Sequence, residues 1–234
     1  MLLLCGVPAT RAQCSAEAKL LVSANSARET VLALHAWAES RRQIYLFDSD
    51  GLELLLHGVI LRLRTGARGD LTVKVRGKNN NPQQAPEDGN GAKCEVDIVG
   101  SAALPSYSLV RRWADKSIPR DGETLYAALS AAQQQLLARA KISIDWHGVK
   151  RIARVRATQW QSRGNEALKD VSIELWEWPN GRLLELSAKT DTPESGHNTL
   201  DQLRRMALAS GLIIDKDQEA KTSIVLHAAR SSAL

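Results

Sequence analysis

The chain of 234 residues is poor in aromatic side chains. Phe, Tyr and Trp together make up 4% of it, and none is interleaved with the basic stretch at residues 61–76. A protein that binds single-stranded nucleic acid needs such aromatic stacking positions beside its basic residues. The scarcity of aromatic residues therefore argues against nucleic acid as a partner.

Cysteines and long apolar runs are also scarce. The three cysteines form no CxxC pair and no Cys/His cluster at zinc-ligand spacing. No stretch has the length and apolarity of a membrane-spanning helix. Cys14 and Cys94 are an even pair once the first twelve residues are set aside. An oxidising compartment can join them, although two buried free thiols are the more common outcome, and the sequence leaves both open.

Residues 1–12, "MLLLCGVPATRA", resemble the remnant of a secretory signal peptide. An apolar run and a proline precede Thr10 and Ala12, two small residues at the spacing that a signal peptidase accepts. The segment lacks basic residues at its start, and Arg11 beside the expected cut is unfavourable. Both a periplasmic or secreted location and a cytoplasmic one therefore stay open.

The rest of the composition is that of a globular protein, with 44% hydrophobic and 24% charged residues. There are 31 Lys and Arg residues against 26 Asp and Glu residues, which gives a formal net charge of +5. A mild basic excess of this kind favours phosphates and small acidic ligands as partners.

The stretch at residues 61–76, "LRLRTGARGDLTVKVR", predicts two consecutive strands. Because alternate side chains of a strand share a face, Arg62, Arg64, Lys74 and Arg76 lie together on one face of this hairpin. Similar alternation predicts strands at residues 15–22, 43–47, 93–100, 150–160, 171–178 and 182–190. Helical patterns occupy about residues 26–42, 123–140 and 198–210.

Two α+β architectures fit about eight strands with two or three helices. In an antiparallel sandwich the charged strand faces would be solvated outer faces. In a closed antiparallel barrel with helices packed outside, the charged faces would line the lumen. Some strands carry pairs of arginines and others carry single carboxylates. This distribution favours the barrel, because in a barrel these cations and possible metal ligands would converge inside the lumen.

The order of the motifs resembles the CYTH domain of the triphosphate tunnel metalloenzymes. The matching blocks are "EAKLLV" (17–22), "YLFDSDGLELLLHGVILRLR" (45–64), "LTVKVRG" (71–77) and "KCEVDI" (93–98). The most specific positions are Tyr45, Phe47, Asp48, Gly58, Arg62 and Arg64. The resemblance spans residues 15–222 and implies a single tunnel domain at about residues 15–225, followed by a tail at residues 226–234.

The resemblance also implies the chemistry. Members of this superfamily bind a nucleoside triphosphate, inorganic triphosphate or thiamine triphosphate inside the tunnel, and most hydrolyse it with one or two Mg²⁺ or Mn²⁺ ions. The residues implied to bind phosphate are Lys19, Arg62, Arg64, Lys74, Arg154 or Arg156, and Lys221, of which Lys19, Arg62 and Arg64 are the candidate catalytic residues. The implied metal ligands are Glu17, Glu95, Asp97 and Glu185. Three further residues lie on the charged faces of their strands but match the family motifs less clearly: Arg76, Glu174 and Lys189.

Two departures from the family pattern concern the metal. The opening signature Glu-x-Glu-x-Lys has Ser15 in place of its first glutamate, and Ser187 follows Glu185 where the family has a second glutamate. A serine hydroxyl attracts a divalent ion much less than a carboxylate does. The sequence therefore leaves three functions open: a metal-dependent triphosphate hydrolase, a binder of triphosphate or polyphosphate that does not cleave it, and an interaction protein that only retains the barrel. The oligomeric state is also open, with a dimer among the possibilities.

Overall fold

The structure, a computed structural model, describes residues 14–77, 93–114, 117–164, 168–190 and 192–231. The expected signal remnant at residues 1–12 lies outside these ranges. Among the described helices, none has the length and apolarity needed to cross a membrane.

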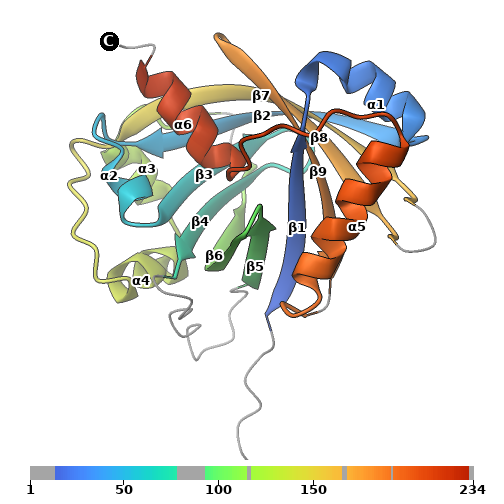
Figure 1. Ribbon diagram of the computed structural model, residues 1–234. Helices are drawn as coiled ribbons and strands as arrows, with labels where there is room; N and C mark the ends of the chain where they lie inside the picture. The colour runs from blue at the N-terminus through green and yellow to red at the C-terminus, as the bar shows by residue number, and fades with distance from the viewer. Residues whose placement is uncertain (1–13, 78–92, 115–116, 165–167, 191, 232–234) are drawn as a thin grey trace, which may run out of the picture.

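The described residues contain nine strands that close into one barrel (Figure 1). The strands are β1 (Ser15–Val22), β2 (Trp37–Asp48), β3 (Val59–Thr65), β4 (Asp70–Arg76), β5 (Lys93–Val99), β6 (Ala102–Arg112), β7 (Lys150–Ser162), β8 (Val171–Trp178) and β9 (Gly181–Thr190). Around the barrel they follow the order β1-β5-β6-β4-β3-β2-β7-β8-β9. The predicted closed barrel is therefore confirmed.

The barrel differs from the expectation in two respects. Strand β6 occupies a stretch that the sequence pattern left as a connection, which brings the strand count to nine instead of about eight. The pairing is also mixed, because β1 lies parallel to β5 while the other neighbours are antiparallel. The parallel pair sets Glu17 opposite Asp97.

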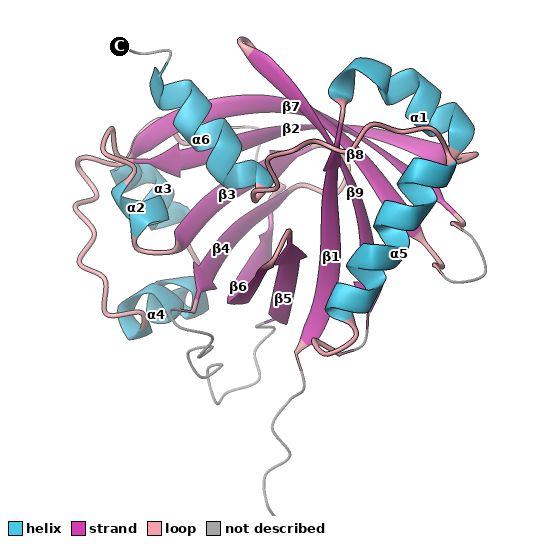
Figure 2. Cartoon of the chain, viewed as in Figure 1, coloured by secondary structure: helices cyan, strands magenta, loops and turns pink. Residues whose placement is uncertain are grey.

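Helices lie outside the barrel and across one of its ends (Figure 2). They are the 3₁₀ turn η1 (Ala24–Ser26), α1 (Ala27–Ala33), α2 (Glu53–Leu56), α3 (Gly122–Ala128), α4 (Ala131–Arg139), α5 (Gly196–Ala209) and α6 (Lys221–Ser231). Helix α5 covers the apolar outer faces of β1 and β9. Helix α6 runs to Ser231, so residues 226–231, the first part of the expected tail, are helical.

The helix expected over residues 26–42 ends early. Helix α1 stops at Ala33, and residues 37–42 begin the long strand β2. His35 has a φ of 46° and Ala38 a φ of 56°, and a left-handed backbone conformation ends a right-handed helix. The thirteen-residue β7 pairs with this extension of β2. Tertiary pairing thus overrides the local helical pattern.

The expected helix over residues 123–140 is two helices, α3 and α4. Leu129 and Ser130 separate them, and Ser130 opens α4 with a capping box. Its side chain accepts a hydrogen bond from the Gln133 backbone N–H, while the Gln133 side chain bonds back to the Ser130 backbone N–H. This reciprocal pair satisfies two backbone donors at the start of the helix.

The lumen is charged in one part and apolar in another. Glu17 and Lys19 of β1 point inward, whereas Ala16, Ala18 and Leu20 pack against α5 outside. In the other part, the apolar inward residues of β2 and β7 pack with Val225 and Leu226 of α6. The lumen therefore contains a charged region beside an apolar region that α6 fills.

A disulfide joins Cys14 to Cys94 across 80 residues of sequence. It connects the residue before β1 to the start of β5, next to the parallel pair of strands. Of the two outcomes that the sequence left open, the structure therefore has the bonded one.

Asp48 in the specific sequence block has a structural role. Its buried carboxylate accepts backbone hydrogen bonds from Ser49, Leu54 and Leu55, which include the first turn of α2. Asp48→Ala should lower the free energy of unfolding by about 2 kcal/mol in urea denaturation, because three backbone donors, two of them in buried hydrogen bonds, lose a charged acceptor. Asp50→Ala is the matched control: Asp50 forms only an exposed ion pair with Lys150, worth about 0–1 kcal/mol. Equal losses in the two variants would contradict this role.

Candidate functional site

A small polar cavity of about 50 Å³ lies in the charged part of the lumen, beside the start of α6. Strands from both halves of the chain contribute to its wall. The lining residues are Lys19, Ile60, Arg62, Thr72, Lys74, Arg76, Asp97, Glu185, Ala220, Lys221 and Thr222. Four of the predicted phosphate-binding cations and two of the predicted metal ligands are therefore in one place.

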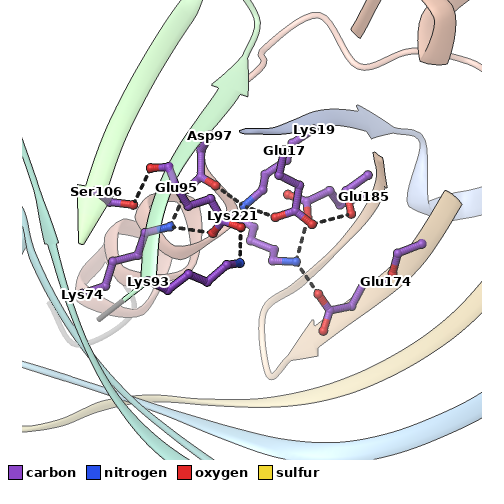
Figure 3. Close-up of polar contacts among 12 residues, drawn as sticks. Glu17, Lys19, Lys74, Lys93, Glu95, Asp97, Ser106, Glu174, Glu185 and Lys221 are labelled. Carbon is purple, nitrogen blue, oxygen red and sulfur yellow. Dashed lines mark hydrogen bonds and ion pairs between the residues drawn. The ribbon is translucent and has the colours of Figure 1, made fainter. Parts of the chain in front are cut away.

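Three carboxylates gather at one side of this cavity. Glu17, Glu95 and Asp97 each offer an oxygen, and these oxygens lie within 4.8 Å of one another (Figure 3). The parallel pairing of β1 and β5 produces the cluster, because it places Glu17 opposite Asp97 and puts Glu95 two residues away on the same face. Clustered carboxylate oxygens suit a hard divalent cation such as Mg²⁺ or Mn²⁺.

Lysine ammonium groups pair with each of these three carboxylates. Lys19 Nζ lies 3.1 Å from Glu17 Oε2 and 2.8 Å from Asp97 Oδ1. Lys74 Nζ donates to Asp97 Oδ2 at 2.6 Å and lies 3.8 Å from Glu95. Burial disfavours the charged form of Asp97, yet the two ammonium groups outweigh it and hold the pKa of Asp97 well below its usual range. Asp97 is therefore ionised at neutral pH.

Lys221 forms a second buried group with Glu174 and Glu185. Its ammonium bonds to Glu174 and donates to Glu185 Oε1 at 2.7 Å, and it sits 4.9 Å from the centre of the Trp176 ring. Burial lowers the pKa of Lys221, but the two carboxylates reverse this and raise it above its usual value. The fourth expected metal ligand, Glu185, thus pairs with a lysine and is not one of the three clustered carboxylates.

Arg62 and Arg76 differ from the lysines because neither forms an ion pair with a carboxylate in the part of the chain that the structure describes. The Nε atom of each is buried without a hydrogen-bond partner among the described residues. Burial, followed by repulsion from Arg64, lowers the pKa of Arg62 to about 10, so it still carries its charge at neutral pH. Two cations with unused donors therefore border the cavity.

The remaining predicted cations lie elsewhere. Arg64 lies on the same face of β3 as Arg62, but it does not line the cavity. Its Nε donates to Asp70 at 2.8 Å. Arg154 and Arg156 are exposed and share the outer face of the barrel with Tyr45 and Gln43. The expectation that they point into the lumen is wrong, because the inward face of β7 is the apolar one that packs against α6.

Arg42 and Ser106 are among the polar residues of the lumen that the sequence pattern missed. Arg42, which lay inside the expected helix, is 3.3 Å from Glu174 Oε1. Ser106 of β6 donates to the backbone oxygen of Glu95 at 3.1 Å. The alternation of Arg42, Ile44 and Leu46 gives the signal for Arg42, once β2 is extended backward. The serines of β6 carry no comparable charge signal.

No family model and no curated protein matches the sequence, whereas solved structures match the fold. A Hippeastrum protein assigned as an adenylyl cyclase, with a dominant triphosphatase activity, has a TM-score of 0.62 at 15% identity, covering 91% of this chain and 94% of that one. A Bacillus halodurans protein assigned as an adenylate cyclase has a TM-score of 0.59 at 14% identity, covering 90% and 96%. At these identities the likeness establishes a shared closed-barrel fold.

Proposed function

We propose that this chain is a divergent CYTH-type tunnel protein that binds a triphosphate or an inorganic polyphosphate in its lumen together with Mg²⁺ or Mn²⁺. The observation that carries the proposal is the meeting of Arg62 and Arg76, two cations with unused donors, with a cluster of three carboxylates beside one cavity. The motif resemblance and the fold of the solved neighbours support the same conclusion.

The cations would hold the phosphate chain. The guanidinium groups of Arg62 and Arg76 can each donate hydrogen bonds to phosphate oxygens, and charge-assisted bonds of this kind are strong. Lys19, Lys74 and Lys221 line the same cavity and can exchange their carboxylate partners for phosphate oxygens. Because the cavity is only about 50 Å³, a triphosphate has to separate these ion pairs as it enters.

The carboxylates would hold the metal. Glu17, Glu95 and Asp97 are close enough to share one divalent ion, which when bound supplies positive charge to phosphate oxygens and lowers the pKa of a water ligand. Lys19 and Lys74 now neutralise these oxygens. When phosphate attracts the two ammonium groups, the carboxylates become free for the metal, so anion and metal should strengthen each other's binding.

A binder that does not hydrolyse its ligand is the second candidate. Ser187 donates a hydrogen bond to Glu17 Oε1 at 3.2 Å, and Ser15 donates to the backbone oxygen of Cys94 at 3.4 Å. Neither serine adds a carboxylate to the cluster, which keeps the metal ligands at three. A weakly held metal favours binding over catalysis.

Calorimetric titration with tripolyphosphate, together with a phosphate-release assay, tests both candidates. We expect binding in chelator that tightens at least tenfold with Mn²⁺, and phosphate release with Mn²⁺ if the chain is a hydrolase. Lys19→Ala should abolish both signals, whereas Arg41→Ala, on an exposed outer position, should change neither. Binding without phosphate release under any metal supports the second candidate. No binding under any condition would leave only the interaction-protein function.

A further inference from the structure

The three carboxylates of the lumen cluster come from two strands that lie side by side. Glu17 belongs to β1, whereas Glu95 and Asp97 belong to β5. The two strands pair in parallel, and this pairing sets Glu17 opposite Asp97. The line along which β1 and β5 meet is called the β1–β5 seam below. The cluster stays together only while this seam stays closed.

The backbone pairing along the β1–β5 seam is short. It joins Ser15–Lys19 to Glu95–Val99, which is less than the pairing of β1 with β9 or of β5 with β6 on either side. A parallel ladder is also slightly less stable per residue than an antiparallel one. For both strands, the seam is therefore the weaker of the two paired edges.

A disulfide closes the seam from the outside. It joins Cys14, the residue before β1, to Cys94, which directly precedes Glu95 in β5. Cys14 packs with the apolar residues beneath α5 and Cys94 with those beneath α3 and α4, so the bond lies on the outer face of the sheet. The carboxylates point the other way, into the lumen (Figure 3). Both cysteines are half-buried, which leaves the bond within reach of a reductant.

Lys19 forms an ion pair that crosses the seam. Its ammonium group on β1 lies 3.1 Å from Glu17 and 2.8 Å from Asp97 of β5. Lys74 and Lys93 also pair with the cluster, but with carboxylates of β5. When Lys19 turns to a phosphate, the attraction across the seam gives way to repulsion between Glu17 and Asp97. The disulfide is a link across the seam that this repulsion cannot break.

We propose that the Cys14–Cys94 disulfide controls the affinity of this cluster for Mg²⁺ or Mn²⁺, so that the lumen binds the ion tightly only while the bond is intact. This control rests on the proposed function, because it acts on the same cluster. A dithiol would reverse it: two electrons and two protons pass to the S–S bond, which becomes two cysteine thiols, while the dithiol becomes a disulfide. Without the bond, the carboxylates can push the two strands apart and separate the ligands.

The anion-binding side of the lumen should not respond to the disulfide. Arg62 lies on β3 and Arg76 on β4, two strands that pair with each other and not with β1 or β5. Their guanidinium groups therefore keep their positions when the seam loosens. Reduction should weaken metal binding and spare anion binding, which distinguishes control of the cluster from general damage to the barrel.

Titration calorimetry with tripolyphosphate, once in EDTA and once as its Mn²⁺ complex, tests the proposal on the full chain carrying Cys5→Ser. This substitution removes the third cysteine, whose thiol could exchange with the bond. In the oxidised chain we expect Mn²⁺ to tighten binding at least tenfold. After reduction with a phosphine, this gain should fall below threefold, while the affinity in EDTA stays within threefold of its oxidised value.

The matched control is the double variant Cys14→Ser and Cys94→Ser. It lacks the bond, so it should show the small Mn²⁺ gain of the reduced chain both with and without the phosphine. If the phosphine still changes the gain in this variant, the effect does not come from the disulfide and the proposal fails.

Hydrogen exchange measures the seam without any ligand. On reduction, the backbone amides of residues 15–19 and 93–99 should exchange at least tenfold faster, because local opening of the seam becomes easier. The amides of β8, on the far side of β9, should exchange at an unchanged rate. Equal exchange along the seam in the oxidised and reduced chains would contradict the proposal.

The calorimetric results separate this proposal from the proposed function. A Mn²⁺ gain that is the same before and after reduction would overturn the control by the disulfide and leave the proposed function standing. No Mn²⁺ gain in the oxidised chain would overturn the proposed function, and the control of the metal with it. A reduced chain that also loses binding in EDTA would show that the bond supports the whole barrel, which overturns the proposal as well.

Discussion

Arg62→Met is expected to weaken tripolyphosphate binding about 100-fold and, at the same time, to raise the free energy of unfolding by about 1–2 kcal/mol. The loss of affinity follows from removing charge-assisted hydrogen bonds worth about 1.5–3 kcal/mol each. The gain in stability follows because Arg62 is a desolvated cation whose Nε has no hydrogen-bond partner among the residues described and whose neighbour Arg64 repels it. Methionine keeps the apolar stem and removes the buried charge.

Calorimetry with tripolyphosphate and urea denaturation measure the two effects on the same sample. Arg62→Lys is the matched variant: it keeps the charge, so it should recover part of the affinity and none of the extra stability. A methionine variant that is less stable than the parent would show that Arg62 supports the fold. Our assignment of Arg62 to ligand binding would then fail.

Asp97→Asn is expected to lower the free energy of unfolding by about 3–5 kcal/mol, the cost of leaving buried charges without their partner. Asp97 is 2% exposed and bonds to both Lys19 and Lys74, so its neutralisation removes the nearest carboxylate from two buried ammonium groups. The carboxylates that remain are farther away, at 3.1 Å from Lys19 and 3.8 Å from Lys74. Urea denaturation at neutral pH measures the loss. Mn²⁺ affinity in the presence of tripolyphosphate should fall as well, because the cluster loses a ligand.

The pH dependence of stability distinguishes an electrostatic contribution of Asp97 from a packing contribution. Because the pKa of Asp97 is lowered in the folded state, its contribution to stability is full above the ordinary carboxyl range and declines as the pH falls below it. The difference between the parent and Asp97→Asn should therefore narrow from pH 7 to pH 3. The double variant with Lys74→Met should regain part of the loss. A difference that stays constant with pH would contradict the electrostatic explanation.

Strand alternation was sufficient to predict most of the barrel but not all of its pairing. The sequence showed the strands in which charged residues alternate with apolar ones. The charged face of such a strand has to line a lumen or face solvent. Strand β6 was missed because Pro105 interrupts it and its inward residues, Ser106 and Ser108, are uncharged. The parallel pairing of β1 with β5 joins segments about 80 residues apart, which no local pattern reports.

The residues of the candidate site were harder to predict from the sequence than the strands. Alternation tells which side chains share a face, but not which face points inward. For β3 and β4 the charged face is inward, whereas β7 turns Ala153 and Val155 to the lumen and its arginines to solvent. The difference arises because α6 fills that part of the barrel with apolar side chains. Only the packing of the last helix decides the orientation of β7.

The pairing of lysines with carboxylates in the lumen has a consequence for how the protein is assembled. In a zinc finger the ligands cannot come together until the ion arrives, so metal supply and folding are one event. In this barrel, lysine side chains supply the positive charge that keeps the carboxylates together without an ion. Lys19, for example, pairs with both Glu17 and Asp97. The folded chain therefore does not need a divalent ion to bring these carboxylates together, and the proposed metal would act in ligand binding alone.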